Sequence, residues 1–166
     1  PGQDPTPDAP YTMGHVVFVL EWSDGRIFLV DAGMDAESAA AFGAPLEALS
    51  GAEPIVPLGS MAEKLRLSVR RVAGIAFTHE HTDHTNGVAA LCRMHEQPIR
   101  LVQNPLQVEE SNYTTRPGLA QLAAAPCLVP EGVGDGPLFR VKGFPGLSFF
   151  AAAGHTPGSL VFVAHV

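Results

Sequence analysis

The feature that most constrains this chain is segment 79–84 (His-Glu-His-Thr-Asp-His), which directly follows an apolar run. Three histidines and two acidic residues fall within these six positions. In an extended segment His79, His81 and Asp83 alternate, so their side chains leave from one side. His84 leaves from the other. Imidazole and carboxylate groups together suit zinc, with iron or manganese as alternatives. A lone histidine would indicate a polar turn, but this dense cluster predicts a metal site.

Composition indicates one globular domain. The chain has 166 residues, of which 46% are hydrophobic and 16% charged, enough for a proper core. A net charge of −7 argues against nucleic acid as the main partner. No apolar stretch approaches the ~18–20 residues that span a bilayer. The sequence carries no signal for an oligomeric state.

The two ends of the sequence predict a fragment. Residues 1–12 are rich in proline and are expected to form a flexible leader. Residues 13–166 then form the N-terminal and central part of one truncated domain. The chain starts without methionine and stops at Val166, inside an apolar run from Leu160 that predicts a strand. The leader fits a cleaved export signal or the cut edge of a longer sequence, so cytoplasmic and exported locations both stay open.

Apolar runs and turn residues predict the elements around the cluster. Residues 16–20 and 27–30 form a hairpin across a Ser-Asp-Gly turn, and the second strand leads into Asp31-Ala32-Gly33. A helix starts near Ser60, which begins a capping box. The strand at 72–77 delivers the cluster at its C-terminal end, where open α/β sheets place their active sites. Further strands are predicted at 99–102, 138–141, 147–152 and from Leu160, and helical segments at 36–42, 88–95, 105–110 and 119–124, with 111–118 irregular.

A second histidine loop follows the strand at 147–152. In segment 154–159 (Gly-His-Thr-Pro-Gly-Ser), proline and two glycines fix a tight backbone path, which makes His155 a rigid ligand position. His155 is the natural third imidazole for an ion held by His79 and His81. A catalytic zinc takes three protein ligands and leaves one position for water, which becomes the nucleophile. The pattern predicts hydrolysis.

Other catalytic motifs fit less well. A zincin H-E-x-x-H motif would need a second histidine where Asp83 stands, and no G-x-S-x-G motif occurs. Cys92 and Cys127 lie in no catalytic context. They are either buried thiols or one disulfide, and we favour small core residues.

Three further histidines are isolated in the sequence. Single histidines seldom act as ligands, so we expect surface exposure or core packing for each. They are His15, His95 and His165.

The motifs together resemble the metallo-β-lactamase superfamily. Segment 31–33, the H-x-H-x-D-H signature at 79–84 and the loop at 154–159 match it in order and placement, from Val16 onward. The resemblance implies an α/β (α+β) fold, namely an αββα sandwich of two mixed β-sheets flanked by helices and incomplete at the C-terminus.

The resemblance also implies a two-zinc site, with iron or manganese possible. One metal would have three histidine ligands, and a carboxylate and a further imidazole would contribute to a second. An aspartate behind the ligands would brace the loop, as outer carboxylates do at metal sites. The ligands of the first metal would be His79, His81 and His155. Asp83 and His84 would contribute to the second metal, and Asp83 could also orient the attacking hydroxide. The bracing aspartate would be Asp31.

The family pattern continues past this sequence. It has a bridging aspartate after the strand that begins at Leu160 and a still later histidine, and His165 comes too early for that role. We therefore expect the 166-residue chain to bind metal weakly and to be poorly active.

The activity that the resemblance implies is hydrolysis of an ester, thioester, lactone or related bond in a small-molecule substrate. Redox relatives carry glutamate where this chain has His81, and the negative charge counts against nucleases. The alternative is a non-catalytic, metal-stabilised binding or sensor domain of the same fold.

Overall fold

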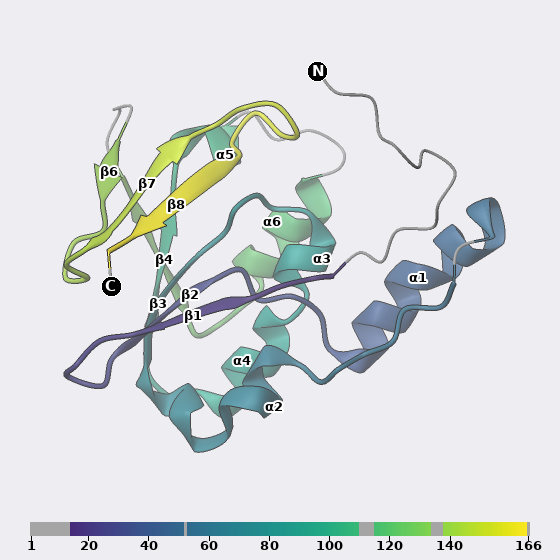
Figure 1. The fold of residues 1–166 in the computed structure, drawn as a ribbon, viewed down its shortest axis with the longest axis horizontal. Helices are drawn as coiled ribbons and strands as arrows, with labels where there is room; N and C mark the ends of the chain where they lie inside the picture. The colour runs from purple at the N-terminus through teal and green to yellow at the C-terminus, as the bar shows by residue number, and fades with distance from the viewer. Residues whose placement is uncertain (1–13, 52, 110–114, 134–137, 166) are drawn as a thin grey trace.

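The computed structural model describes residues 14–51, 53–109, 115–133 and 138–165 (Figure 1). The predicted leader at 1–12 lies outside these residues. The described part of the chain forms two β-sheets, with helices against one of them. Two sheets with flanking helices confirm the predicted fold class. None of the described helices is long and apolar enough to cross a membrane.

The larger sheet has five strands in the order β1-β2-β3-β4-β5. β1 is antiparallel to β2, as the predicted hairpin requires, and β2 to β5 run parallel, so this sheet is mixed. β2 is buried along its whole length, as expected for a parallel strand covered on both faces. The strands are β1 (Phe18–Glu21), β2 (Ile27–Val30), β3 (Val72–Ala76), β4 (Ile99–Gln103) and β5 (Leu128–Gly132).

In the described residues the smaller sheet is antiparallel, not mixed as the resemblance implied, and it packs face to face on the larger one. It comprises β6 (Phe139–Arg140), β7 (Leu147–Ala151) and β8 (Leu160–Ala164). One core lies between the sheets, where Phe28 and Val102 of the larger sheet share a cluster with Phe149 and Leu160 of the smaller. Burial of this apolar surface holds the sheets together.

The helices form a second core on the other face of the larger sheet. Leu29, Ile75 and Leu101 point into it from the strands, and Leu91 and Leu122 from the helices. The helical segments are α1 (Ala36–Ser50), α2 (Met61–Leu65), the 3₁₀ segment η1 (Arg66–Arg71), α3 (Thr82–Thr85), α4 (Val88–Met94), α5 (Pro105–Glu109) and α6 (Arg116–Ala123).

The capping box predicted at Ser60 is confirmed. Its hydroxyl accepts from the Glu63 amide, and the Glu63 carboxylate accepts from the Ser60 amide.

Four elements differ from the sequence prediction, one of them α3 (Thr82–Thr85), which is described with the candidate site. α1 continues past residue 42 to Ser50, because Asp35 caps its start and Gly51 its end. α6 begins at Arg116, inside the segment predicted to be irregular. β5 was not predicted; Pro130 interrupts its apolar pattern and is tolerated because β5 is an edge strand.

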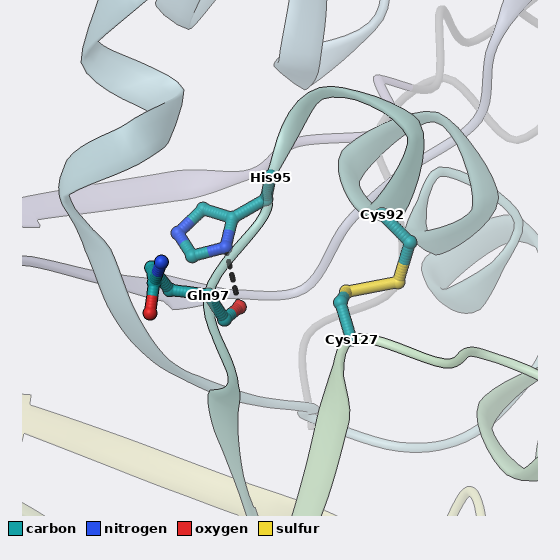
Figure 2. The surroundings of a disulfide bond; sticks show 4 residues. All are labelled: Cys92, His95, Gln97 and Cys127. Carbon is teal, nitrogen blue, oxygen red and sulfur yellow. Dashed lines mark hydrogen bonds between the residues drawn. A yellow bond between two sulfur atoms is a disulfide. The ribbon is translucent and has the colours of Figure 1, made fainter.

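The two cysteines form a disulfide, so the preference for buried thiols was wrong. Cys92 of α4 is bonded to Cys127, which directly precedes β5, with their Cα atoms 5.2 Å apart (Figure 2). α4 packs over the start of β5 and brings two residues 35 positions apart within bonding range. On the segment that leaves α4, the His95 ring donates from Nδ1 to the Gln97 carbonyl at 2.7 Å.

Candidate metal centre

The candidate site forms where loops from both sheets meet. Asp31 follows β2, segment 79–84 follows β3, and His155 lies in the loop between β7 and β8. The amide of Leu160, the first residue of β8, donates to the Thr78 carbonyl at 2.7 Å. This hydrogen bond joins the smaller sheet to the cluster loop, which brings His155 to the other histidines.

Three histidine side chains converge as the sequence predicted. His79, His81 and His155 each offer a ligand atom, and these atoms all lie within 4.8 Å of one another. His155 Nε2 is 3.2 Å from His81 Nδ1. Nitrogen ligands at about 2.0–2.1 Å from one zinc ion lie roughly this far apart, so the donor set fits a single metal.

Asp31 braces the cluster from behind. Its Oδ1 accepts from the Thr78 amide at 2.8 Å, and its Oδ2 accepts from the Thr78 hydroxyl at 2.9 Å and from His84 Nδ1 at 3.0 Å. The carboxylate is 2% exposed. The residue has a φ of 67°, a conformation that aspartate tolerates better than most residues. Because Nδ1 of His84 is engaged, its Nε2 is left to face the site.

The end of the cluster is helical, not extended as predicted. α3 begins at Thr82, so Asp83 and His84 lie on one helical turn. Their side chains therefore come together, with Asp83 Oδ2 3.4 Å from His84 Nε2, instead of leaving on opposite sides. The Thr85 hydroxyl donates to the His81 carbonyl at 3.3 Å and supports the turn.

Close backbone packing fixes the Asp31 loop against α3. The Ala32 and Gly33 amides both donate to the His84 carbonyl, at 2.8 and 3.1 Å. A Cβ on Gly87 would lie 2.1 Å from the Ala32 carbonyl oxygen, so only glycine allows this approach. The brace and the helical turn therefore form one unit.

Sequence reasoning missed two residues at this site. Thr78 links Asp31 to His79, because the Thr78 hydroxyl contacts both Asp31 and, at 3.2 Å, His79 Nδ1. The position of Thr78 just before the cluster was the available signal in the sequence. His15 is exposed, in agreement with its prediction. Its Nε2 nevertheless lies 3.7 Å from Asp83 Oδ2, and its ring packs edge-on against Phe42.

The other two isolated histidines also agree with their prediction. His95 is buried and His165 is exposed.

The metal-free cluster favours neutral imidazoles at its centre. Burial lowers the pKa of His79 to about 3, and repulsion by His84, His81 and His155 acts in the same direction. Burial and His155 also lower the pKa of His81. Neutral imidazole is the form that binds a metal.

The pKa values of His84 and Glu80 are raised instead of lowered. Burial lowers the pKa of His84, but the hydrogen bond to Asp31 and the charges of Asp31 and Asp83 outweigh it and raise that pKa. Burial raises the pKa of Glu80 to about 7, partly opposed by a hydrogen bond from Gln103. Glu80 is 1% exposed and points away from the histidines, an orientation that alternation in an extended loop explains.

Comparison with known sequences identifies one family and one relative. A family model described as the metallo-beta-lactamase superfamily matches residues 11–166. An uncharacterized protein of Aquifex aeolicus (strain VF5) is 34% identical over 113 residues, which are 66% of this chain and 52% of that protein. The chain thus spans about half the length of this relative.

Solved structures with a similar fold include two N-acyl homoserine lactone hydrolases. One, described as a quorum-quenching lactonase, has a TM-score of 0.58 at 17% identity and covers 88% of this chain and 53% of its own. The other, with N-hexanoyl-L-homoserine bound at its catalytic metal centre, has a TM-score of 0.60 at 19% identity, covering 88% and 56%. At this identity the likeness extends to the fold alone.

Proposed function

Because the chain belongs to the metallo-beta-lactamase superfamily, we propose that it is a zinc-dependent hydrolase of an ester, thioester, lactone or related bond. The observation that carries the proposal is the convergence of His79, His81 and His155 within 4.8 Å. Three imidazoles with an exposed face match a catalytic zinc site, which keeps one position open. Iron or manganese would also be accepted by this donor set.

Each residue of the site would have a distinct task. His79, His81 and His155 would hold the first metal, and Asp83 with His84 would contribute to a second. A bound zinc ion would act as a Lewis acid that activates water and polarises the carbonyl under attack. Asp83 presents Oδ2 next to His84 Nε2, where it could accept a hydrogen bond from the attacking water and orient it.

Asp31 would act through the other residues. Its Oδ2 accepts from His84 Nδ1, which fixes the tautomer that leaves Nε2 as the ligand atom. It also holds Thr78 and thereby the start of the loop that carries His79 and His81.

Lactones are the substrate class to test first. The two similar structures are named as homoserine lactone hydrolases, and the −7 charge disfavours a polyanionic substrate. We therefore expect a small carbonyl compound that is not a polyanion.

The test is turnover of a lactone, an aryl ester and a thioester by zinc-loaded protein. Single His79→Ala, His81→Ala and His155→Ala variants should each lose nearly all turnover. His165→Ala is the matched control, because His165 is exposed and isolated from the cluster in sequence, and it should keep wild-type rates. Because we expect the 166-residue chain to be poorly active, the test compares low rates. A wild-type rate no higher than that of the three variants, with stability changes in those variants, would favour a binding domain instead.

A further inference from the structure

Glu80 is the one acidic side chain of the cluster that turns away from the histidines. It lies between His79 and His81 in sequence, yet it is 1% exposed. Its Oε1 accepts a hydrogen bond from Gln103 Nε2, at the end of β4, at 2.8 Å. Its Oε2 is buried and has no partner among the described residues. A buried carboxylate oxygen left without a donor is costly, so it calls for one.

Glu80 also lines a small cavity. Glu80 forms one side, Gln107 of α5 and Thr115 form another, and Thr156 and Gly158 of the His155 loop close it. The space open to water is about 10 Å³, which is close to the room that one water molecule needs. Two of the lining residues carry hydroxyl groups that could bind the same water.

Close backbone packing holds both loops that contribute to the cavity. A Cβ on Gly158 would lie 2.5 Å from the backbone nitrogen of Gln107, and a Cβ on Gly118 would lie 2.0 Å from the Glu80 carbonyl oxygen. The Gln107 side chain also donates from Nε2 to the Phe77 carbonyl at 2.9 Å. These contacts pack the His155 loop against α5 and the cluster loop against α6, which fixes the positions of the residues that line the cavity.

We propose that one buried water molecule occupies this cavity and donates a hydrogen bond to Glu80 Oε2. The water connects the loop of His79 and His81 to the loop of His155 from behind. Glu80 is then a positioning residue for the histidines. That effect rests on the proposed metal centre, whereas the presence of the water does not.

A high-resolution crystal structure of the protein, metal-free and zinc-loaded, tests the water directly. We expect density in the cavity at about 2.6–3.2 Å from Glu80 Oε2 in both forms. An empty cavity, or one filled by a side chain, would overturn the proposal. This outcome is independent of zinc, so it is separable from a failure of the proposed hydrolase function.

Two substitutions and a control test the positioning role. Glu80→Gln keeps the acceptor for Gln103 and places an amide that can donate to the water. Glu80→Met has similar length but removes both contacts. The control Gln103→Met removes the Gln103 bond and leaves Oε2 and the cavity in place.

Zinc affinity, from competition with a chelating dye, and the visible spectrum of the cobalt(II) form are the two signals. Glu80→Met should bind zinc about 10–100-fold more weakly and change the cobalt spectrum. Glu80→Gln should keep the zinc affinity and the cobalt spectrum of the wild type. Gln103→Met should lose less zinc affinity than Glu80→Met. Wild-type affinity in Glu80→Met, or an equal loss in Glu80→Gln, would contradict the role. If Glu80→Met does not fold, Glu80→Gln and the density decide.

Discussion

At the scale of single residues, one carboxylate organises the candidate site. Asp31 is nearly inaccessible to solvent and accepts hydrogen bonds from Thr78 and from His84. Those two residues stand on either side of the His79–Asp83 segment. The Asp31 carboxylate accepts three hydrogen bonds, so only another acceptor of the same shape can replace it. A substitution at Asp31 therefore tests how much this support matters to the metal ligands.

We expect Asp31→Asn to weaken zinc binding about 10–100-fold, as loss of an outer partner does at other metal sites. The new amide group donates, so it cannot accept from both the Thr78 hydroxyl and His84 Nδ1. Asparagine also tolerates the positive φ, so the backbone is preserved. Isothermal titration with zinc measures the change. The matched control is Asp35→Asn at the start of α1, where asparagine caps as well as aspartate, and its affinity should be unchanged.

The histidine pKa values predict how stability depends on pH. The pKa of His79 is about 3 in the metal-free folded chain, against an ordinary value of 6.5. Between these values the unfolded chain binds more protons, so the unfolding free energy should fall as the pH drops from 6.5 towards 3. Above pH 6.5 this residue contributes no pH dependence.

Urea unfolding of metal-free protein at several pH values checks this. The loss of stability between pH 6.5 and 4 should be smaller in His79→Gln, which cannot take up the proton. Identical pH profiles for the wild type and the variant would show that His79 titrates normally.

At the scale of elements, the disulfide ties α4 to the start of β5 (Figure 2). α4 begins three residues after α3 ends, so this bond also anchors the segment that follows the cluster. Closing a loop of 35 residues restricts the unfolded chain and stabilises the fold by about 3–4 kcal/mol in the chain-entropy model.

We expect Cys92→Ser with Cys127→Ser to lower the unfolding free energy by about this amount. Urea unfolding should give the same loss for wild-type protein treated with a reductant. Thiol titration of the denatured, unreduced wild type should find no free thiol. Two reactive thiols and no effect of reductant would contradict the disulfide.

The contact between α6 and the cluster loop predicts an unusual glycine effect. Gly118 lies in a helix, where alanine ordinarily stabilises by about 0.5–1 kcal/mol. Here its Cβ would lie 2.0 Å from the Glu80 carbonyl oxygen, so Gly118→Ala should destabilise, by about 1–3 kcal/mol.

Thermal unfolding compares this variant with Gly132→Ala in β5. An added Cβ at Gly132 meets nothing within 4 Å, so that control should be close to the wild type. A Gly118→Ala protein as stable as the wild type would mean that α6 does not press on the loop.

At the scale of the whole molecule, two cores and three layers place the site at an edge where the sheets meet (Figure 1). The Leu160–Thr78 hydrogen bond joins the sheets beside the site. Elsewhere, Trp22 Nε1 donates to the Pro145 carbonyl at 2.9 Å and Arg26 donates to the Gly143 carbonyl at 2.7 Å. The sheets are thus fastened at the β6–β7 turn as well.

Local patterns in the sequence were enough to predict the strands that deliver the candidate ligands. Apolar runs followed by turn residues mark β2, β3 and β7, and a loop that carries a candidate site residue follows each run. The three histidines could be grouped because their loops follow strands in the same way. Asp31 could be placed behind them only through the family resemblance.

Contacts set by tertiary packing could not be predicted from the sequence. Nothing near His15 in the sequence indicates that its side chain lies beside Asp83. The cysteine pairing depends on how α4 crosses to β5, and spacing alone left both states open. The extended alternation assumed for Asp83 and His84 does not hold, because the helical turn α3 begins at Thr82.

X-ray absorption spectroscopy of protein loaded with one equivalent of zinc tests most directly whether His79, His81 and His155 hold one metal ion. The proposed site predicts three imidazole nitrogens at about 2.0–2.1 Å and one further light-atom ligand. His155→Ala should reduce the imidazole count by one. Fewer than three imidazoles in the wild type, or a spectrum that His155→Ala leaves unchanged, would contradict the proposed centre.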